Sequence, residues 1–221
     1  MSELILSYPE PEVIKFTLNR PEKRNALNRT LIDAMLSELD GIETKGKVLV
    51  LEGAGTNFCS GADLTELSSG VMEKVGKLLV AFATTSIPTI AYVHGSVAAG
   101  GVGLAAAVDL AVASPDARFF LPEFQKGIAP FFVSILLKNI LSERHFKELA
   151  FTCEPFSAQR AQEVGLVNSI GKETLDPYIQ SLLKIDSRAF ASFKRHLTNK
   201  EQLENDFKKA LQQQVELLAR S

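Results

Sequence analysis

The sequence has few of the residues that build metal centres or disulfide frameworks. It contains only two cysteines, Cys59 and Cys153, which stand far apart and belong to no Cys-X-X-Cys pair. This spacing argues against a cysteine-ligated zinc site and against a disulfide-stapled domain, and it predicts reduced thiols in an intracellular protein. The glycine-rich nucleotide motifs GxGxxG and GxxxxGKS/T are also missing. A Rossmann-type or P-loop nucleotide site is therefore not expected.

Strong charge of either sign is missing as well. The formal net charge is −2 and no long run of lysine and arginine occurs, which argues against nucleic acid or an anionic membrane as a partner. The amino-terminal segment has no basic stretch followed by an apolar core, so we expect no secretory signal peptide. Proline, glycine and polar residues interrupt the apolar stretch of residues 87–112, which makes it a poor candidate for a membrane span. These features predict a cytoplasmic protein.

What remains is an ordinary globular composition, with 46% hydrophobic and 23% charged residues over 221 positions. Two short apolar runs around a Pro-Glu-Pro turn predict a β-hairpin within residues 4–19. Apolar side chains at helical spacing predict a helix from Leu31, with Asn28 or Thr30 as its cap. Strands and helices alternate up to about residue 131 and helices follow, which predicts an α/β fold with a helical C-terminal part. The last helix is expected to bury a stripe formed by Leu203, Phe207, Leu211, Val215 and Leu218.

The segment from Val93 to Val112 consists mostly of small residues. Gly100 and Gly101 lie where a predicted strand ends and a predicted helix over residues 100–107 begins. A helix N-terminus offers unpaired N–H groups, and glycine lets a ligand oxygen approach them. A second small-residue turn, residues 56–64, is a candidate for another such amide, and two amides aimed at one oxygen form an oxyanion hole. The spacing alone leaves open that both are only tight turns.

Several stretches, in order along the chain, resemble motifs of the crotonase superfamily of enoyl-CoA hydratases and isomerases. They are LNRPEKRNALN (18–28), NFCSGADLTEL (57–67), PTIAYVHGSVAAGGVGLAAAVDLAVAS (88–114), ARFFLPEFQKGIAP (117–130) and SAQRAQEVGLVNSI (157–170). The resemblance implies a ββα spiral core over residues 1–170 and a shortened helical region over residues 171–221 for oligomerisation or active-site cover. It also implies an acyl-CoA substrate, no metal, no cofactor besides the coenzyme A of that substrate, and a homotrimer or a dimer of trimers.

The same resemblance assigns roles to individual residues. The backbone amides of Ala62 and Gly100 would hold the thioester carbonyl oxygen of an acyl-CoA. Lys23, Arg24 and Ala26 would lie along its adenosine and pantetheine part, where cationic side chains suit the phosphates. A solvated loop is the alternative for the two cations. The other substrate-binding residues that it implies are Ser60, Gly61, Asp63, Gly101, Pro130, Phe131 and Phe132.

The residues around this oxyanion site indicate the reaction. Hydratases of the superfamily place two glutamates around a water molecule, and here the first of these positions is Gly103 and the second is Glu123. A single carboxylate suits a double-bond shift, because it can remove a proton from C2 of a 3-enoyl-CoA and return it to C4. The stretch EFQKGIAPFF (123–132) also resembles monofunctional enoyl-CoA isomerases. If Glu123 faces an apolar acyl pocket, desolvation should raise its pKa, and a surface glutamate at the end of a strand is the alternative.

Other functions stay open, because one oxyanion hole serves many acyl-CoA reactions. The alternatives are a hydratase, a decarboxylase, a thioesterase and a non-catalytic relative that only binds acyl-CoA. Outside the site, His94 and Asp109 are expected to be structural, and Asp63 is also expected to hold backbone amides of its turn. Lys74 and Lys77 are expected on an exposed helix face, and Cys59 is expected to be buried.

Overall fold

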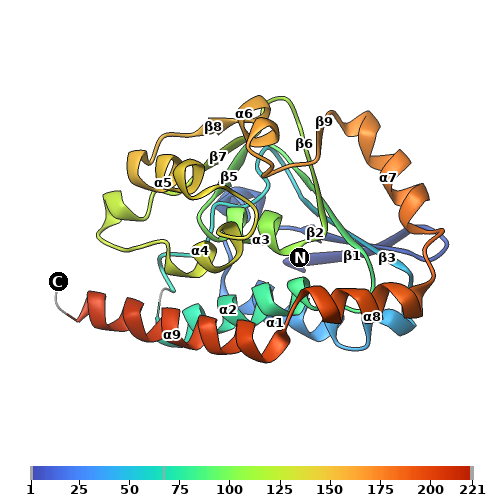
Figure 1. Ribbon diagram of the computed structural model, residues 1–221, viewed down its shortest axis with the longest axis horizontal. Helices are drawn as coiled ribbons and strands as arrows, with labels where there is room; N and C mark the ends of the chain where they lie inside the picture. The colour runs from blue at the N-terminus through green and yellow to red at the C-terminus, as the bar shows by residue number, and fades with distance from the viewer. Residues whose placement is uncertain (1, 67, 220–221) are drawn as a thin grey trace.

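The computed structural model describes residues 2–66 and 68–219. Within these residues the main sheet has six strands in the order β1-β2-β3-β4-β6-β9 (Figure 1). Its strands are β1 (Leu4–Glu10), β2 (Val13–Leu18), β3 (Val48–Gly53), β4 (Thr89–Val93), β6 (Leu110–Ala113) and β9 (Ser169–Ile170). β1 is antiparallel to β2, and all the other neighbours are parallel. An α/β fold is therefore confirmed.

The strands follow the sequence patterns closely. β1 and β2 form the predicted hairpin, in which Leu4 pairs with Leu18. The first four residues of β3, Val48 to Leu51, are all buried, as is usual for an interior parallel strand that is covered on both faces. The core of the sheet therefore forms from short, continuous apolar runs.

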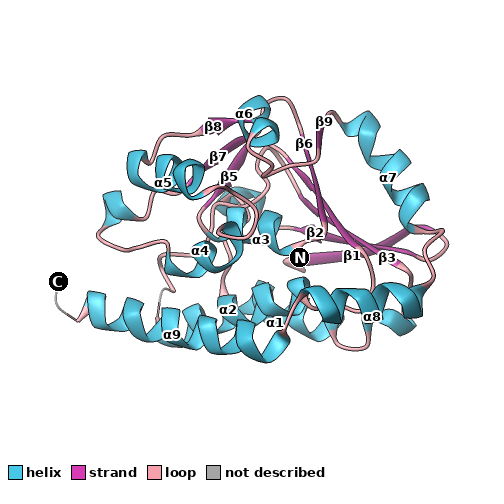
Figure 2. Ribbon diagram, in the orientation of Figure 1, coloured by secondary structure: helices cyan, strands magenta, loops and turns pink. Residues whose placement is uncertain are grey.

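A second sheet lies beyond the sharp turn that follows β4. It contains β5 (Ser96–Ala98), β7 (Arg118–Phe120) and β8 (Phe156–Ser157), which Figure 2 shows apart from the long strands of the main sheet. The turn requires Gly95, because its φ is 53° and a Cβ there would clash with the carbonyl oxygen of Thr56. The expectation of helices alone after residue 131 is wrong in detail, since β8 and β9 lie in that part. Both have two residues, too few to produce an alternating pattern.

Three helices frame the centre of the molecule, namely α1 (Arg29–Leu39), α2 (Ser69–Ala83) and α3 (Gly100–Ala107). Of the two predicted caps, Asn28 is the one that caps α1, by accepting a hydrogen bond from the amide of Leu31 at 2.9 Å. Residues 101–107 of α3 are all buried, and the helix packs between α2 and α4 (Phe131–Leu137). Its small side chains allow this close packing, so packing accounts for much of the glycine- and alanine-rich segment.

The remaining helices are α5 (Glu143–Thr152), α6 (Ala158–Glu163), α7 (Leu175–Leu182), α8 (Ser187–Leu197) and α9 (Lys200–Leu218). Short 3-10 turns occur at Pro21–Lys23, Ile42–Thr44, Phe124–Lys126 and Lys172–Thr174. α7 packs on the main sheet, while α9 packs on α2 and α4 along one side of the molecule (Figure 1). No helix in the described part of the chain is both apolar enough and long enough to span a bilayer.

The predicted stripe of α9 is only partly correct. Leu203 and Phe207 are buried, but Val215 and Leu218 are 41% and 40% exposed. The buried face continues instead through Ala210 and Gln214. Positions 203, 207, 210 and 214 also follow helical spacing, so the sequence offered two adjacent faces. The face of α9 that packs on the rest of the protein is therefore the one that carries Gln214.

Candidate active site

A pocket of about 100 Å³ lies among α2, α3, α4, α9 and the two small-residue turns. Most of its wall is apolar, and the side chains that form it include Leu64, Met72, Val75, Leu79, Ile128 and Val133. The side chains with polar groups in the wall are Ser60, Glu123, Lys126 and Gln214. Ala62, Gly100, Pro130 and Phe132 line the same space. With Ser60 and Glu123, six of the thirteen predicted site residues therefore line this pocket.

The two glycine turns are in direct contact. The backbone of Cys59 bridges to Val97 and that of Leu27 bridges to Ala62. Gly61 has a φ of +92°, and a Cβ on it would lie 2.8 Å from the Cβ of Ala99 and 3.1 Å from the amide nitrogen of Gly100. These positions therefore require glycine for the close approach of two backbones. A Cβ at Gly101 would likewise clash with the carbonyl oxygen of Cys59.

The amides of Ala62 and Gly100 lie side by side at this contact. A Cβ built on Gly100 would stand only 3.7 Å from the amide nitrogen of Ala62. Neither amide donates a hydrogen bond to another residue in the part of the chain that the structure describes. Gly100 is the first residue of α3, and the preceding Ala99 has φ 49° and ψ −116°, an unusual conformation for a non-glycine residue. Two free amides that line one pocket can bind an oxygen that carries negative charge.

Glu123 is the buried carboxylate of the pocket. It is 7% exposed, and its Oε2 atom has no hydrogen-bond partner among the described residues. Its position is fixed locally, because its carbonyl oxygen accepts hydrogen bonds from the amides of Lys126 at 2.9 Å and Ile128 at 3.1 Å. Burial raises the pKa of Glu123 to about 7, against a smaller opposing effect of its own backbone amide and of the Lys126 charge. Such a carboxyl can both accept and donate a proton near neutral pH.

Position 103, where a second carboxylate was considered, is crowded. A Cβ at Gly103 would lie 3.1 Å from the Val133 side chain and 3.2 Å from the Leu79 side chain, so these neighbours would have to shift to admit one. This crowding comes from apolar side chains of α4 and α2 that pack on α3. Among the described residues that line the pocket, Glu123 is the only one with a carboxylate.

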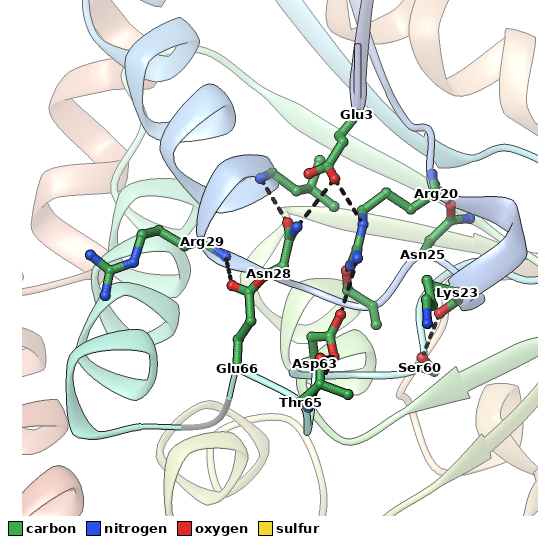
Figure 3. A network of polar contacts seen from close by, with 12 residues as sticks. Glu3, Arg20, Lys23, Asn25, Asn28, Arg29, Ser60, Asp63, Thr65 and Glu66 are labelled. Atoms are coloured by element: carbon green, nitrogen blue, oxygen red, sulfur yellow. Dashed lines mark hydrogen bonds and ion pairs between the residues drawn. The ribbon is translucent and has the colours of Figure 1, made fainter. Parts of the chain in front are cut away.

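An arginine that the sequence analysis missed holds the two loops of the site together. Figure 3 shows the Arg20 side chain, from the loop after β2, between Glu3 and Asp63. Its guanidinium donates to the carbonyl oxygen of Ala26 at 2.6 Å and pairs with Asp63 at 3.1 Å and Glu3 at 3.1 Å. Arg20 is 8% exposed, and a buried arginine with carboxylate partners could be found only from the fold. The sequence shows it as one more charge in a charged loop.

Asp63 belongs to this framework and does not line the pocket. Its Oδ1 accepts hydrogen bonds from the amide and hydroxyl of Thr65, and its Oδ2 pairs with Arg20. The hydrogen bonds from Thr65, together with Arg20, lower the pKa of Asp63. Its predicted role in the turn agrees with these contacts, and its predicted contact with substrate stays a prediction.

The predicted coenzyme A loop lies directly against the second glycine turn. The amide of Ser60 donates to the carbonyl oxygen of Arg24 at 3.0 Å, and the Ser60 hydroxyl lies 3.5 Å from the carbonyl oxygen of Lys23. The Lys23 and Arg24 side chains are exposed and Ala26 is buried. None of the three lines the apolar pocket, and the same holds for Gly61, Gly101 and Phe131. Phe131 packs instead against the main core.

Four further ionisable side chains outside the pocket, His94, Asp109, Lys194 and Cys59, do not form part of its wall. Asp109 accepts hydrogen bonds from Thr89 and from the ammonium of Lys194, which is 2.8 Å away. Lys194 is 7% exposed, and burial lowers its pKa although Asp109 opposes this. His94 bonds to the carbonyl oxygen of Gly55. Burial raises the pKa of Cys59 to about 12, so this thiol is protonated near neutral pH and is no nucleophile.

Comparison with known proteins places this site in a family. The sequence model of a family described as enoyl-CoA hydratase/isomerase matches residues 10–220. The chain belongs to the enoyl-CoA hydratase/isomerase family. It is thus an acyl-CoA enzyme of the crotonase superfamily, and the resemblance seen in the sequence motifs is confirmed.

Individual relatives of the enoyl-CoA hydratase/isomerase family agree with this assignment. The chain is 30% identical to the bacillaene synthase dehydratase PksH of Bacillus subtilis (strain 168), over 86% of this chain and 78% of that protein. It is 34% identical to the 2,3-dehydroadipyl-CoA hydratase of Escherichia coli (strain K12), over 77% of this chain and 69% of the relative. The crystal structure of an enoyl-CoA hydratase from Mycobacterium avium superposes with a TM-score of 0.90 at 29% identity, covering 98% of this chain and 91% of that one. The crotonase fold is therefore confirmed.

Proposed function

We propose that this enzyme moves the double bond of a 3-enoyl-CoA thioester to the 2 position. The observation that carries the proposal is the pairing of one buried carboxylate, Glu123, with the two free amides of Ala62 and Gly100 in a single apolar pocket. A proton transfer within one molecule needs one group that changes between base and acid. It does not need a second carboxylate to activate water, and Gly103 supplies none.

The mechanism begins with the thioester carbonyl oxygen between the amides of Ala62 and Gly100. The Glu123 carboxylate takes a proton from C2, and the electron pair of that C–H bond forms a dienolate whose negative charge spreads onto the thioester oxygen. The protonated Glu123 then gives the same proton to C4, which leaves the double bond between C2 and C3. No atom is gained or lost. Each amide donor contributes about 3–4 kcal/mol of transition-state stabilisation in comparable sites.

Two further features support this reaction. The apolar wall raises the pKa of Glu123 to about 7, which lies in the range where one carboxyl can act in both steps. The exposed side chains of Lys23 and Arg24 stand beside the Ser60 turn, where we propose that they meet the phosphates of coenzyme A.

Hydration of a 2-enoyl-CoA, or the reverse dehydration, is the second candidate. It is favoured by the relatives, two of which are named as a dehydratase and as a 2,3-dehydroadipyl-CoA hydratase. The two candidates differ in whether water enters the product, so product analysis separates them.

The test is the rise in absorbance of the conjugated thioester when the protein is mixed with trans-3-hexenoyl-CoA. We expect a rise with the wild-type protein, none with Glu123→Gln, and an unchanged rise with the control Glu201→Gln, which alters an exposed glutamate of α9. Absence of the rise in the wild type, together with hydration of trans-2-hexenoyl-CoA, would replace the isomerase with the hydratase. Equal rates for wild type and Glu123→Gln would remove Glu123 from the mechanism.

A further inference from the structure

Gln214 is a buried polar side chain that the proposed mechanism does not use. It comes from α9, lines the pocket that also contains Glu123, and is 3% exposed. Its Nε2 atom is buried and has no hydrogen-bond partner among the residues that the structure describes. It follows Ala210 on the face of α9 that packs inward, so its amide lies on the protein side of the helix.

An unpaired amide in such a place is costly. Leaving a buried donor without a partner costs about 1–3 kcal/mol, and an apolar residue of similar size at position 214 would avoid that cost. Ser60 and Lys126, the other lining residues with a polar side-chain group, are half-buried and exposed respectively. The buried polar side chains of the pocket wall are thus Glu123 and Gln214.

The two unpaired atoms have complementary chemistry. Nε2 of Gln214 can only donate a hydrogen bond, while Oε2 of an ionised Glu123 can only accept one. A hydroxyl group satisfies both at once, because it accepts from the amide and donates to the carboxylate. A hydrocarbon chain satisfies neither. With a plain alkyl or alkenyl group in the pocket, Nε2 of Gln214 and Oε2 of Glu123 would therefore both remain without a hydrogen bond.

We propose that Gln214 is a substrate-contacting residue that, together with Glu123, binds a hydroxyl on the acyl group of the thioester. The inference rests on the proposed function, because Glu123 acts there on C2 and C4 and so lies over C3. A hydroxyl on C3 then reaches Glu123 directly, and Gln214 holds the same oxygen. Gln214 thereby selects 3-hydroxyacyl-CoA over the corresponding saturated acyl-CoA.

Isothermal titration with 3-hydroxybutanoyl-CoA and butanoyl-CoA tests this selection. We expect the wild-type protein to bind the hydroxylated thioester about tenfold more tightly, the factor that one hydrogen bond supplies. In Gln214→Met, which keeps the length of the side chain but removes its amide, the preference disappears while butanoyl-CoA binds at least as tightly as before. The control Gln213→Met alters an exposed neighbour and keeps the preference. Retained butanoyl-CoA binding shows that the variant is folded.

The outcomes separate this inference from the proposed reaction. A wild-type protein without the preference, or a preference that survives in Gln214→Met, overturns the role of Gln214 even if trans-3-hexenoyl-CoA is isomerised. A Gln214-dependent preference without isomerisation overturns the reaction and leaves the role of Gln214 intact. Failure of the wild type to bind either thioester overturns both.

Discussion

Gly61 and Gly100 approach each other so closely that a Cβ on Gly61 would stand 3.1 Å from the amide nitrogen of Gly100. This contact sets the relative position of the two turns whose amides, at Ala62 and Gly100, face the pocket. The proposed oxyanion site is therefore built from two backbone segments that meet where residue 61 has no side chain. The distance between the two turns therefore depends on the absence of a Cβ at residue 61.

Gly61→Ala is expected to lower kcat with trans-3-hexenoyl-CoA by about 10²–10³, because displacing one oxyanion-hole donor has that effect. The matched control is Gly165→Ala. Gly165 has a similar φ of +84°, but its Cβ would lie 3.8 Å from the nearest backbone atom, the carbonyl oxygen of Ile140. Both variants carry the strain of a positive φ, and only Gly61→Ala pushes the turns apart. Equal activity losses in the two variants would show that strain alone, rather than the turn contact, is responsible.

The pH dependence of the reaction follows from the raised pKa of Glu123. Proton removal needs the carboxylate form, so kcat/KM is expected to rise with pH up to a plateau above about 7 and to fall tenfold per pH unit well below it. Initial rates with a CoA thioester between pH 5 and 9 measure this profile. A plateau that extends unchanged down to pH 5 would contradict the raised pKa.

The raised pKa of Glu123 also makes stability depend on pH, but stability falls with rising pH where activity rises. The folded protein holds the Glu123 proton more tightly than the unfolded chain, whose carboxyl titrates near its usual value of 4.5. The contribution of Glu123 to the free energy of unfolding is fully present below pH 4.5 and is lost as the pH rises through about 7. The shift corresponds to about 3 kcal/mol. Urea unfolding is therefore expected to show Glu123→Gln more stable than wild type at pH 8, with the difference shrinking towards pH 5.

Arg20→Met is expected to destabilise the protein by about 3–5 kcal/mol, because it leaves Asp63 and Glu3 without the cation that pairs with them inside the protein. Arg160→Met is the control, since Arg160 also pairs with two carboxylates, those of Glu148 and Glu163, but at the surface. Its loss should cost less than about 1 kcal/mol. Urea unfolding at pH 7 measures the free energy of unfolding of both variants. Losses of the same size would show that the Arg20 network stabilises the protein no more than a surface ion pair does.

Short sequence patterns predicted the turns and helix starts, because these depend on residues close together in the chain. The Pro-Glu-Pro turn indicated the hairpin, Asn28 indicated the start of α1, and the paired glycines indicated the start of α3 at Gly100. The burial of Glu123 was expected only through the family resemblance, because its apolar neighbours in the chain are equally compatible with a surface glutamate at a strand end. The hairpin and the two helix starts each depend on neighbours within a few positions.

Other features depend on residues that are distant in the chain. Arg20 is charged and stands in a polar loop, and only the approach of Glu3, Ala26 and Asp63 makes it a buried anchor. In the second half of α9 the hydrophobic pattern favoured Leu211 and Val215, which are more apolar than the residues that the fold buries there, Ala210 and Gln214. The strands β8 and β9 exist because their partners β7 and β6 pair with them.

The sequence by itself determined the family, the α/β class and the two glycine turns, because backbone conformation at a glycine and hydrophobic periodicity are properties of short segments. Only the tertiary structure decided which polar side chains face the pocket. Burial of a polar group costs free energy that must be offset by partners from other elements. Whether Arg20 pairs with Asp63, and whether Gln214 is buried in the pocket wall, is settled only when α9 and the loops pack together.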